Sequence, residues 1–155
     1  MVKFKNLAQM QAWLEKNVHQ VVNKSAEIER ILVDAMVESV WMNVYDAYEP
    51  QQYNRREDEG GLADERNYEV TSVSLVDGRV RMVVENLTQG NDNLSHTFLS
   101  DTIEAGIKSN WNNSNGSWAE ARPYIAETIK KLKENPEELA GTLRKGLAAK
   151  GLKIQ

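Results

Sequence analysis

Hydrophobic positions in the first part of the chain recur at steps of three and four residues from Leu7 to Val40. This is the period of an amphipathic helix, and neither proline nor glycine interrupts it. The pattern predicts one long helix over residues 1–43, with 23–25 as its least helical point. At about 1.5 Å per residue, such a helix exceeds the width of a small domain. We therefore expect part of it to pack on a neighbouring subunit, and the part from Ile28 to Trp41 to pack in the chain's own core.

Residues 68–87 carry a different pattern, in which apolar and polar residues alternate on both sides of Asp77-Gly78. Asp-Gly favours the positive φ angles of a type I′ turn, so the pattern predicts a β-hairpin. Val80, Met82 and Val84 alternate with arginines, which indicates one covered face and one wet face. An isolated hairpin is marginally stable, so we expect a third strand or a covering helix.

Three shorter helices are predicted in the C-terminal part of the chain. The first carries Ile103 and is expected to be capped by Ser100 or Asp101; the second opens at Arg122-Pro123. The third begins at Asn135-Pro136, with asparagine as the N-cap and proline at the first helical position, and ends at Gly151. The order of elements predicts an α+β fold with a long N-terminal helix and an antiparallel sheet built on the hairpin, packed against C-terminal helices.

Length and composition are those of a soluble globular protein. The 155 residues suffice for a single domain over 1–155, divided into the helix 1–43, an extended loop 44–67, and hairpin plus helices 68–155. Hydrophobic residues make up 41% and charged residues 27%. No apolar run suggests a membrane span or a signal segment, so no membrane partner is expected. The absence of cysteine excludes disulfides and thiolate chemistry, as expected of a protein made in a reducing cytoplasm.

Charge is unevenly distributed along the chain, whose net charge is −4. Residues 46–69 contain eight acids against three arginines, a net of −5, and residues 128–155 contain seven bases against three acids, a net of +4. The simplest interpretation is two solvated faces. A second interpretation is that the acidic segment of one copy meets the basic tail of the next, because head-to-tail contacts of this kind build rings.

Candidate catalytic chemistry is sparse. His19 and His96 have no partner at a recognisable spacing, and Gly60-Gly61 lacks the residues of a phosphate-binding loop. The acids at 57–59, 64 and 65 lack the alternating ligand pattern of a calcium loop, so a solvated charge run is the better interpretation. We therefore predict no catalytic, cofactor-binding or metal-binding residue, and no enzyme activity.

The segment Tyr45–Asn67 combines tyrosines and arginines, the residue types that anchor protein interfaces. The alternative is that its tyrosines pin the loop onto the chain's own helices. A loop of this length is uncommon in a compact domain and usually has a function. The candidate subunit-interface residues are Tyr45, Tyr48, Pro50, Tyr53, Arg55, Arg56 and Asp64. Trp111 and Trp118, in an Asn- and Ser-rich stretch, are candidate partner contacts.

The residues of the Tyr45–Asn67 segment resemble a sequence pattern of a known group of proteins. Val44-Tyr45-Asp46-x-Tyr48-x-Pro50-x-x-Tyr53-x-Arg55-Arg56, followed by Gly60-Gly61-Leu62-x-Asp64 and Asn67, is similar to a pattern in small head–tail joining or tail-completion (neck) proteins of long-tailed phages and prophages of Gram-positive bacteria. The downstream segments Glu85-Asn86-Leu87-Thr88, Leu99 to Gly106 and Arg122 to Thr128 resemble that group too. The similarity covers roughly Val44 to the end of the chain.

The resemblance implies a structural virion protein, assembled in the host cytoplasm, that joins head and tail as a ring of identical copies. Its partners would be itself and other phage connector, portal-adaptor or tail proteins, with non-specific proximity to packaged DNA. Lys130, Lys131 and Lys133 would then form a basic face that lines the channel or faces a subunit. Two alternatives stay open: a prophage-encoded oligomeric regulatory or host-interaction protein, and a virion-associated wall hydrolase.

Overall fold

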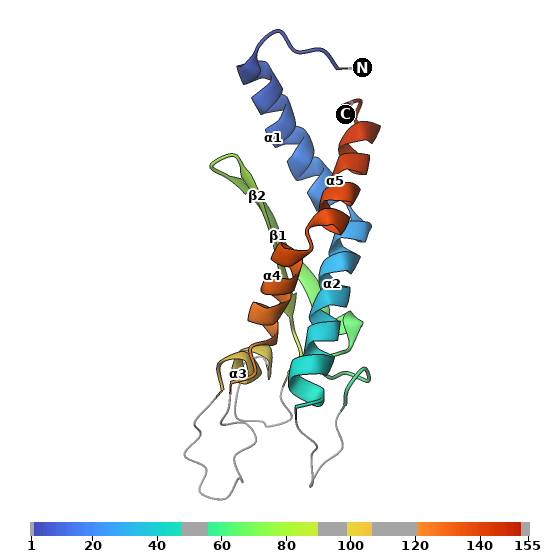
Figure 1. Cartoon of the computed structure of the whole chain (residues 1–155), viewed down its shortest axis with the longest axis vertical. Coiled ribbons are helices and arrows are strands. Elements are labelled where there is room, and N and C mark those ends of the chain that lie inside the picture. The colour runs from blue at the N-terminus through green and yellow to red at the C-terminus, as the bar shows by residue number, and fades with distance from the viewer. Residues whose placement is uncertain (1, 48–55, 90–98, 107–120, 153–155) are drawn as a thin grey trace, which may run out of the picture. The chain divides into compact units, whose positions relative to one another are not determined.

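A computed structural model describes residues 2–47, 56–89, 99–106 and 121–152 (Figure 1). Its N-terminal helical segment is divided into α1 (Leu7–Asn23) and α2 (Ala26–Val40), and a π-helical turn (Trp41–Tyr45) continues α2. The interruption falls at the least helical point of the sequence. Ser25 causes it, because its Oγ accepts a hydrogen bond from the Ile28 N–H at 3.1 Å and so caps a new helix.

The predicted hairpin is present as strands β1 (Tyr68–Val76) and β2 (Arg79–Asn86). Asp77 and Gly78 have φ angles of 51° and 70°, as a type I′ turn requires. The sheet has two strands within the described residues. Val80, Met82 and Val84 are half-buried while Arg79 and Arg81 are exposed, so the predicted alternation is confirmed.

The C-terminal helices are α3 (Leu99–Ala105), α4 (Tyr124–Glu134) and α5 (Glu137–Ala149). The α+β class, with its N-terminal and C-terminal helices, is confirmed. Ser100 or Asp101 was expected to cap α3, but both lie within it, and the buried hydroxyl of Ser100 donates to the Asn86 carbonyl at 3.1 Å. α5 begins one residue later than expected, with Pro136 at the N-cap. Its C-terminal end is as predicted: Gly151 has φ +92°, and the Leu152 N–H returns to the Leu147 carbonyl at 3.2 Å.

Tertiary contacts divide the chain into two compact units. The first unit contains Met1–Leu32, Val70–Val84 and Asn135–Gln155. Its helices α1 and α5 lie side by side (Figure 1). Gly146 of α5 lies against the buried Val21 of α1. The other buried apolar side chains of this unit are Ile28, Ile31 and Leu147.

The second unit contains Val33–Glu69 and Glu85–Glu134. The C-terminal half of α2 packs here, and the Ser39 hydroxyl donates to the Tyr124 carbonyl of α4 at 2.7 Å. Glu104 of α3 accepts hydrogen bonds from two N–H groups in the first turn of α4, at 2.8 and 3.1 Å. A carboxylate is stabilised there by the unpaired amides at the helix N-terminus. The assignment of 1–155 to one domain stays a prediction.

Candidate interface at the 45–67 segment

The N-terminal flank of the 45–67 segment is a turn of π-helix. Its wider winding is closed by the Asp46 N–H, which donates to the Trp41 carbonyl at 2.9 Å. The rings of Trp41 and Tyr45 pack edge to face, with centroids 4.9 Å apart. Trp41 is 36% exposed and its neighbour Met42 is 62% exposed. Large apolar side chains therefore reach the surface of the chain where the segment begins.

The C-terminal flank starts with a tight turn at residues 57–60. The Arg56 guanidinium donates to the Gln89 carbonyl at 2.6 Å, and the Glu59 N–H donates to the Arg56 carbonyl at 2.6 Å. A Cβ on Gly61 would overlap the Glu57 carbonyl oxygen and lie 2.7 Å from the Glu57 nitrogen. The second glycine of the Gly-Gly pair is therefore required by this close approach of the backbone.

Asp64 holds the next turn. The residue is 4% exposed, and its carboxylate accepts hydrogen bonds from the Gly60 N–H at 2.7 Å and from the Arg66 backbone N–H at 3.0 Å. The Arg66 side chain adds a forked pair of bonds at 2.8 and 2.6 Å. These hydrogen bonds from Arg66 lower the pKa of Asp64 below its ordinary value and outweigh burial, which raises it. Asp64 thus binds its own loop in this chain, and its predicted role in a subunit contact stays a prediction.

Two buried side chains from the end of the hairpin fasten this loop. The Asn86 amide donates to the Leu62 carbonyl at 3.0 Å, and the same carbonyl accepts the Tyr68 hydroxyl at 2.8 Å. The Thr88 hydroxyl donates to the Gly61 carbonyl at 3.0 Å. Burial raises the pKa of Tyr68 to about 12.

Asn67 completes the arrangement. Its amide donates to the Gly61 carbonyl at 2.9 Å and to the Thr88 hydroxyl at 3.0 Å. We call Asp64, Asn67, Asn86 and Thr88 the anchoring cluster. It joins two of the segments that carried the resemblance, Gly60 to Asn67 and Glu85 to Thr88, through buried polar groups whose hydrogen bonds are satisfied within the chain.

The other predicted site residues fall in different places. Tyr45 is half-buried, and Tyr48, Pro50, Tyr53, Arg55, Trp111 and Trp118 lie outside the described residues. On the predicted basic face of α4, Lys130 pairs with Glu127 at 3.4 Å and Lys131 pairs with Glu38 of α2. Lys133 is exposed and forms no ion pair within the part of the chain that is described.

Sequence reasoning missed the structural roles of Asn86, Thr88, Arg66 and Glu104. Asn86 and Thr88 were noted only for the resemblance, and nothing in their local pattern indicated burial. A signal was present in their residue types, because asparagine and threonine at the end of a strand suit hydrogen bonds to irregular backbone. Within the described ranges no three His, Asp or Glu side chains are placed to hold a metal ion. No helix among those residues is long and apolar enough to cross a membrane.

The fold and the anchoring cluster define a small α+β protein that fixes one irregular segment with buried polar side chains. The family model of YomN matches residues 6–149, almost the whole chain, and the chain belongs to the YomN family. That name is of a phage or prophage type, which supports the phage part of the resemblance and leaves its head–tail part a prediction. No curated protein and no solved structure matches the chain.

Proposed function

We propose that this chain is a structural virion protein of a long-tailed phage, which joins head and tail as a ring of identical copies. The family match supports the phage origin. The anchoring cluster is the observation that carries the structural role. Three buried polar side chains, Asp64, Asn86 and Thr88, and the half-buried Asn67 fix the position of a loop, and the carboxylate of Asp64 is fully engaged by hydrogen-bond donors. Buried groups that fix a loop in advance reduce the entropy lost when that loop binds a partner.

The exposed apolar residues at the other flank support the same proposal. Trp41 and Met42 stand at the start of the segment, and aromatic and methionine side chains are enriched at protein interfaces. The anchoring cluster fixes one end of the segment, and these exposed apolar residues border the other end. Such a segment is suited to bind a protein surface. The partner proposed is a second copy, with connector, portal-adaptor or tail proteins above and below the ring.

The wall-hydrolase alternative gains no support from Asp64, the buried carboxylate of the 45–67 segment. A general acid in a glycosidase needs a raised pKa, whereas the pKa of Asp64 is lowered by its hydrogen bonds from Arg66. The regulatory alternative predicts a free oligomer. It therefore differs from the virion proposal in whether purified particles contain the chain.

The proposal is tested with Met42→Glu, which places a charge on the exposed flank. We expect the variant to fold like the wild type, to lose ring assembly, and to be absent from particles in a complementation experiment. The matched control is Ala8→Glu, which adds the same charge at an exposed position of α1. Size measurement by light scattering and quantification of the chain in purified particles give the two readouts. Normal assembly and incorporation of Met42→Glu would contradict the proposed role of this flank.

A further inference from the structure

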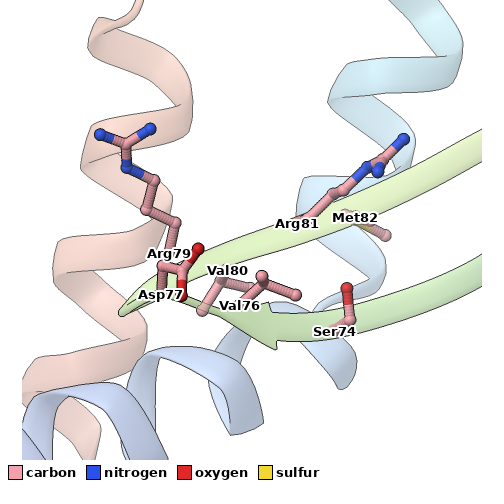
Figure 2. A pocket seen from close by; sticks show the side chains of 7 residues that line it. All are labelled: Ser74, Val76, Asp77, Arg79, Val80, Arg81 and Met82. Carbon is pink, nitrogen blue, oxygen red and sulfur yellow. The ribbon is translucent and has the colours of Figure 1, made fainter.

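The hairpin carries a further surface near its Asp77-Gly78 turn, and this surface has no role in the function proposed above. Ser74, Val76, Asp77, Arg79, Val80, Arg81 and Met82 line an open hollow of about 610 Å3, and we call these residues the hairpin surface (Figure 2). Arg79 and Arg81 are two positions apart on β2, so both side chains project from the same face of the sheet, as Figure 2 shows. Val76, another residue of the hairpin surface, is 57% exposed.

The hairpin surface holds two arginines and one carboxylate, that of Asp77. Neither Arg79 nor Arg81 forms an ion pair with any described residue. The basic tail differs, because four of its cations already have carboxylate partners. These pairs are Lys130–Glu127, Lys131–Glu38, Arg144–Glu137 and Lys145–Glu27. The hairpin surface is therefore a better basic partner for another copy than the basic tail, which was the second interpretation of the charge distribution.

The matching acidic surface is the turn Glu57–Glu59, which we call the acidic turn. Asp58 and Glu59 are exposed and form no ion pair with a described residue. The hydrogen bonds of the nearby Arg66 side chain go to Asp64 instead. The acidic turn is held in place through Arg56, whose backbone closes the turn and whose guanidinium binds the Gln89 carbonyl. It thus presents the carboxylates of Asp58 and Glu59 from a fixed backbone, and carboxylates suit the forked donors of arginine.

We propose that the hairpin surface of one copy docks on the acidic turn of the next copy. The two surfaces belong to different parts of the chain, so the contact is heterologous and repeats from copy to copy into a ring. Arg79 and Arg81 pair with Asp58 and Glu59 of the neighbour, and Val76 loses exposed apolar area. This inference rests on the proposed ring and names its subunit contact.

The experiment uses two charge reversals in the full chain, Arg79→Glu with Arg81→Glu and Asp58→Lys with Glu59→Lys. The first variant has two acidic surfaces and the second has two basic ones, so neither assembles alone. When the two variants are mixed in equal amounts, the acidic hairpin surface of the first binds the basic turn of the second. The basic hairpin surface of the second likewise binds the acidic turn of the first. Assembly is therefore restored, with the two chains alternating. Mass measurement by light scattering, with one chain tagged, records size and composition. A control reverses Arg30 and Lys150, both exposed and outside the two surfaces, and should assemble as the wild type does.

Three outcomes overturn the contact: normal assembly of either reversed variant, a mixture that stays unassembled although both chains are folded, or a wild-type chain that is monomeric at all concentrations. Binding of duplex DNA that depends on Arg79 and Arg81 while assembly is unaffected would also overturn it. Should a reversal unfold the chain, Arg79→Gln with Arg81→Gln and Asp58→Asn with Glu59→Gln apply the same test, and weaker assembly is expected from each. Incorporation of the wild type into particles is measured separately, so failure of this contact is distinguishable from failure of the virion proposal.

Discussion

The contact between α1 and α5 makes a sharp prediction, because α5 contains two glycines in different surroundings. A Cβ added to Gly146 would overlap Val21 Cγ1, and would lie 3.3 Å from Cγ2 and 3.4 Å from Cβ of the same side chain. A Cβ added to Gly141 would meet nothing within 4 Å. Gly146→Ala and Gly141→Ala therefore make the same chemical change, and only the first creates a clash.

The expected magnitudes follow from two opposing effects. Alanine is favoured over glycine inside a helix by about 0.5–1 kcal/mol, and both variants receive this gain. Forcing an extra methyl group into a packed site costs about 1–3 kcal/mol. Val21 is buried and β-branched, so it cannot easily swing away. Gly141→Ala should raise the free energy of unfolding by about 0.5–1 kcal/mol. The free energy of unfolding of Gly146→Ala should be lower than that of Gly141→Ala by about 1–3 kcal/mol.

Urea unfolding followed by circular dichroism measures both variants at one protein concentration, with an unchanged denaturant slope as the check on comparability. A double-mutant cycle with Val21→Ala then tests the cause, because removing the valine methyl groups should relieve most of the harm of Gly146→Ala. Equal stability of the two alanine variants, or a cycle with no coupling, would show that α1 and α5 do not meet at Gly146.

Three further predictions concern the cap of α2 and the titration of the second unit. Ser25→Ala should lower the free energy of unfolding by about 1 kcal/mol in urea unfolding, and Ser25→Asp should preserve it; equal loss in both would argue against a cap. The pKa of Asp64 is lower in the folded chain than its ordinary value of 3.8. Its contribution to stability is therefore fully present above pH 3.8 and is lost as the pH falls below that value. Acid unfolding should thus be less pH-dependent in Asp64→Asn, with Glu65→Gln as the exposed control, and unchanged pH dependence would contradict the Asp64–Arg66 bonds. Burial raises the pKa of Tyr68 to about 12 and that of Tyr124 further, so stability should fall as the pH rises above 10, where unfolded tyrosines ionise. Phenolate absorbance of the folded chain should contain a late-titrating component that decreases in Tyr68→Phe and in Tyr124→Phe, and absence of this component would refute the burial of these rings.

The elements with local causes were predicted from the sequence. The hairpin follows from Asp77-Gly78 between alternating residues, and the end of α5 follows from Gly151. The division of the N-terminal helix was only partly visible. Its position at 23–25 could be read from weak helix formers, but the hydrogen bond from Ile28 to Ser25 that starts α2 required the structure.

The contribution of Asn86 and Thr88 to the anchoring cluster was not predictable, because their side-chain hydrogen bonds to the 60–67 loop join residues far apart in sequence. Thr88 binds the carbonyl of Gly61, and Asn86 binds that of Leu62, across the whole hairpin. Asparagine and threonine are mostly exposed in proteins, so burial at these positions depends on tertiary packing. The same holds for Asp64, whose acidic neighbourhood suggested a charged surface while its Arg66 partner and burial give it a place inside the loop.

Electron microscopy of purified phage particles, with this chain carrying a small visible tag, tests the central claim most directly. The account predicts a ring of tag density at the joint between head and tail. Particles that are complete and infectious yet contain no copy of the chain would contradict it.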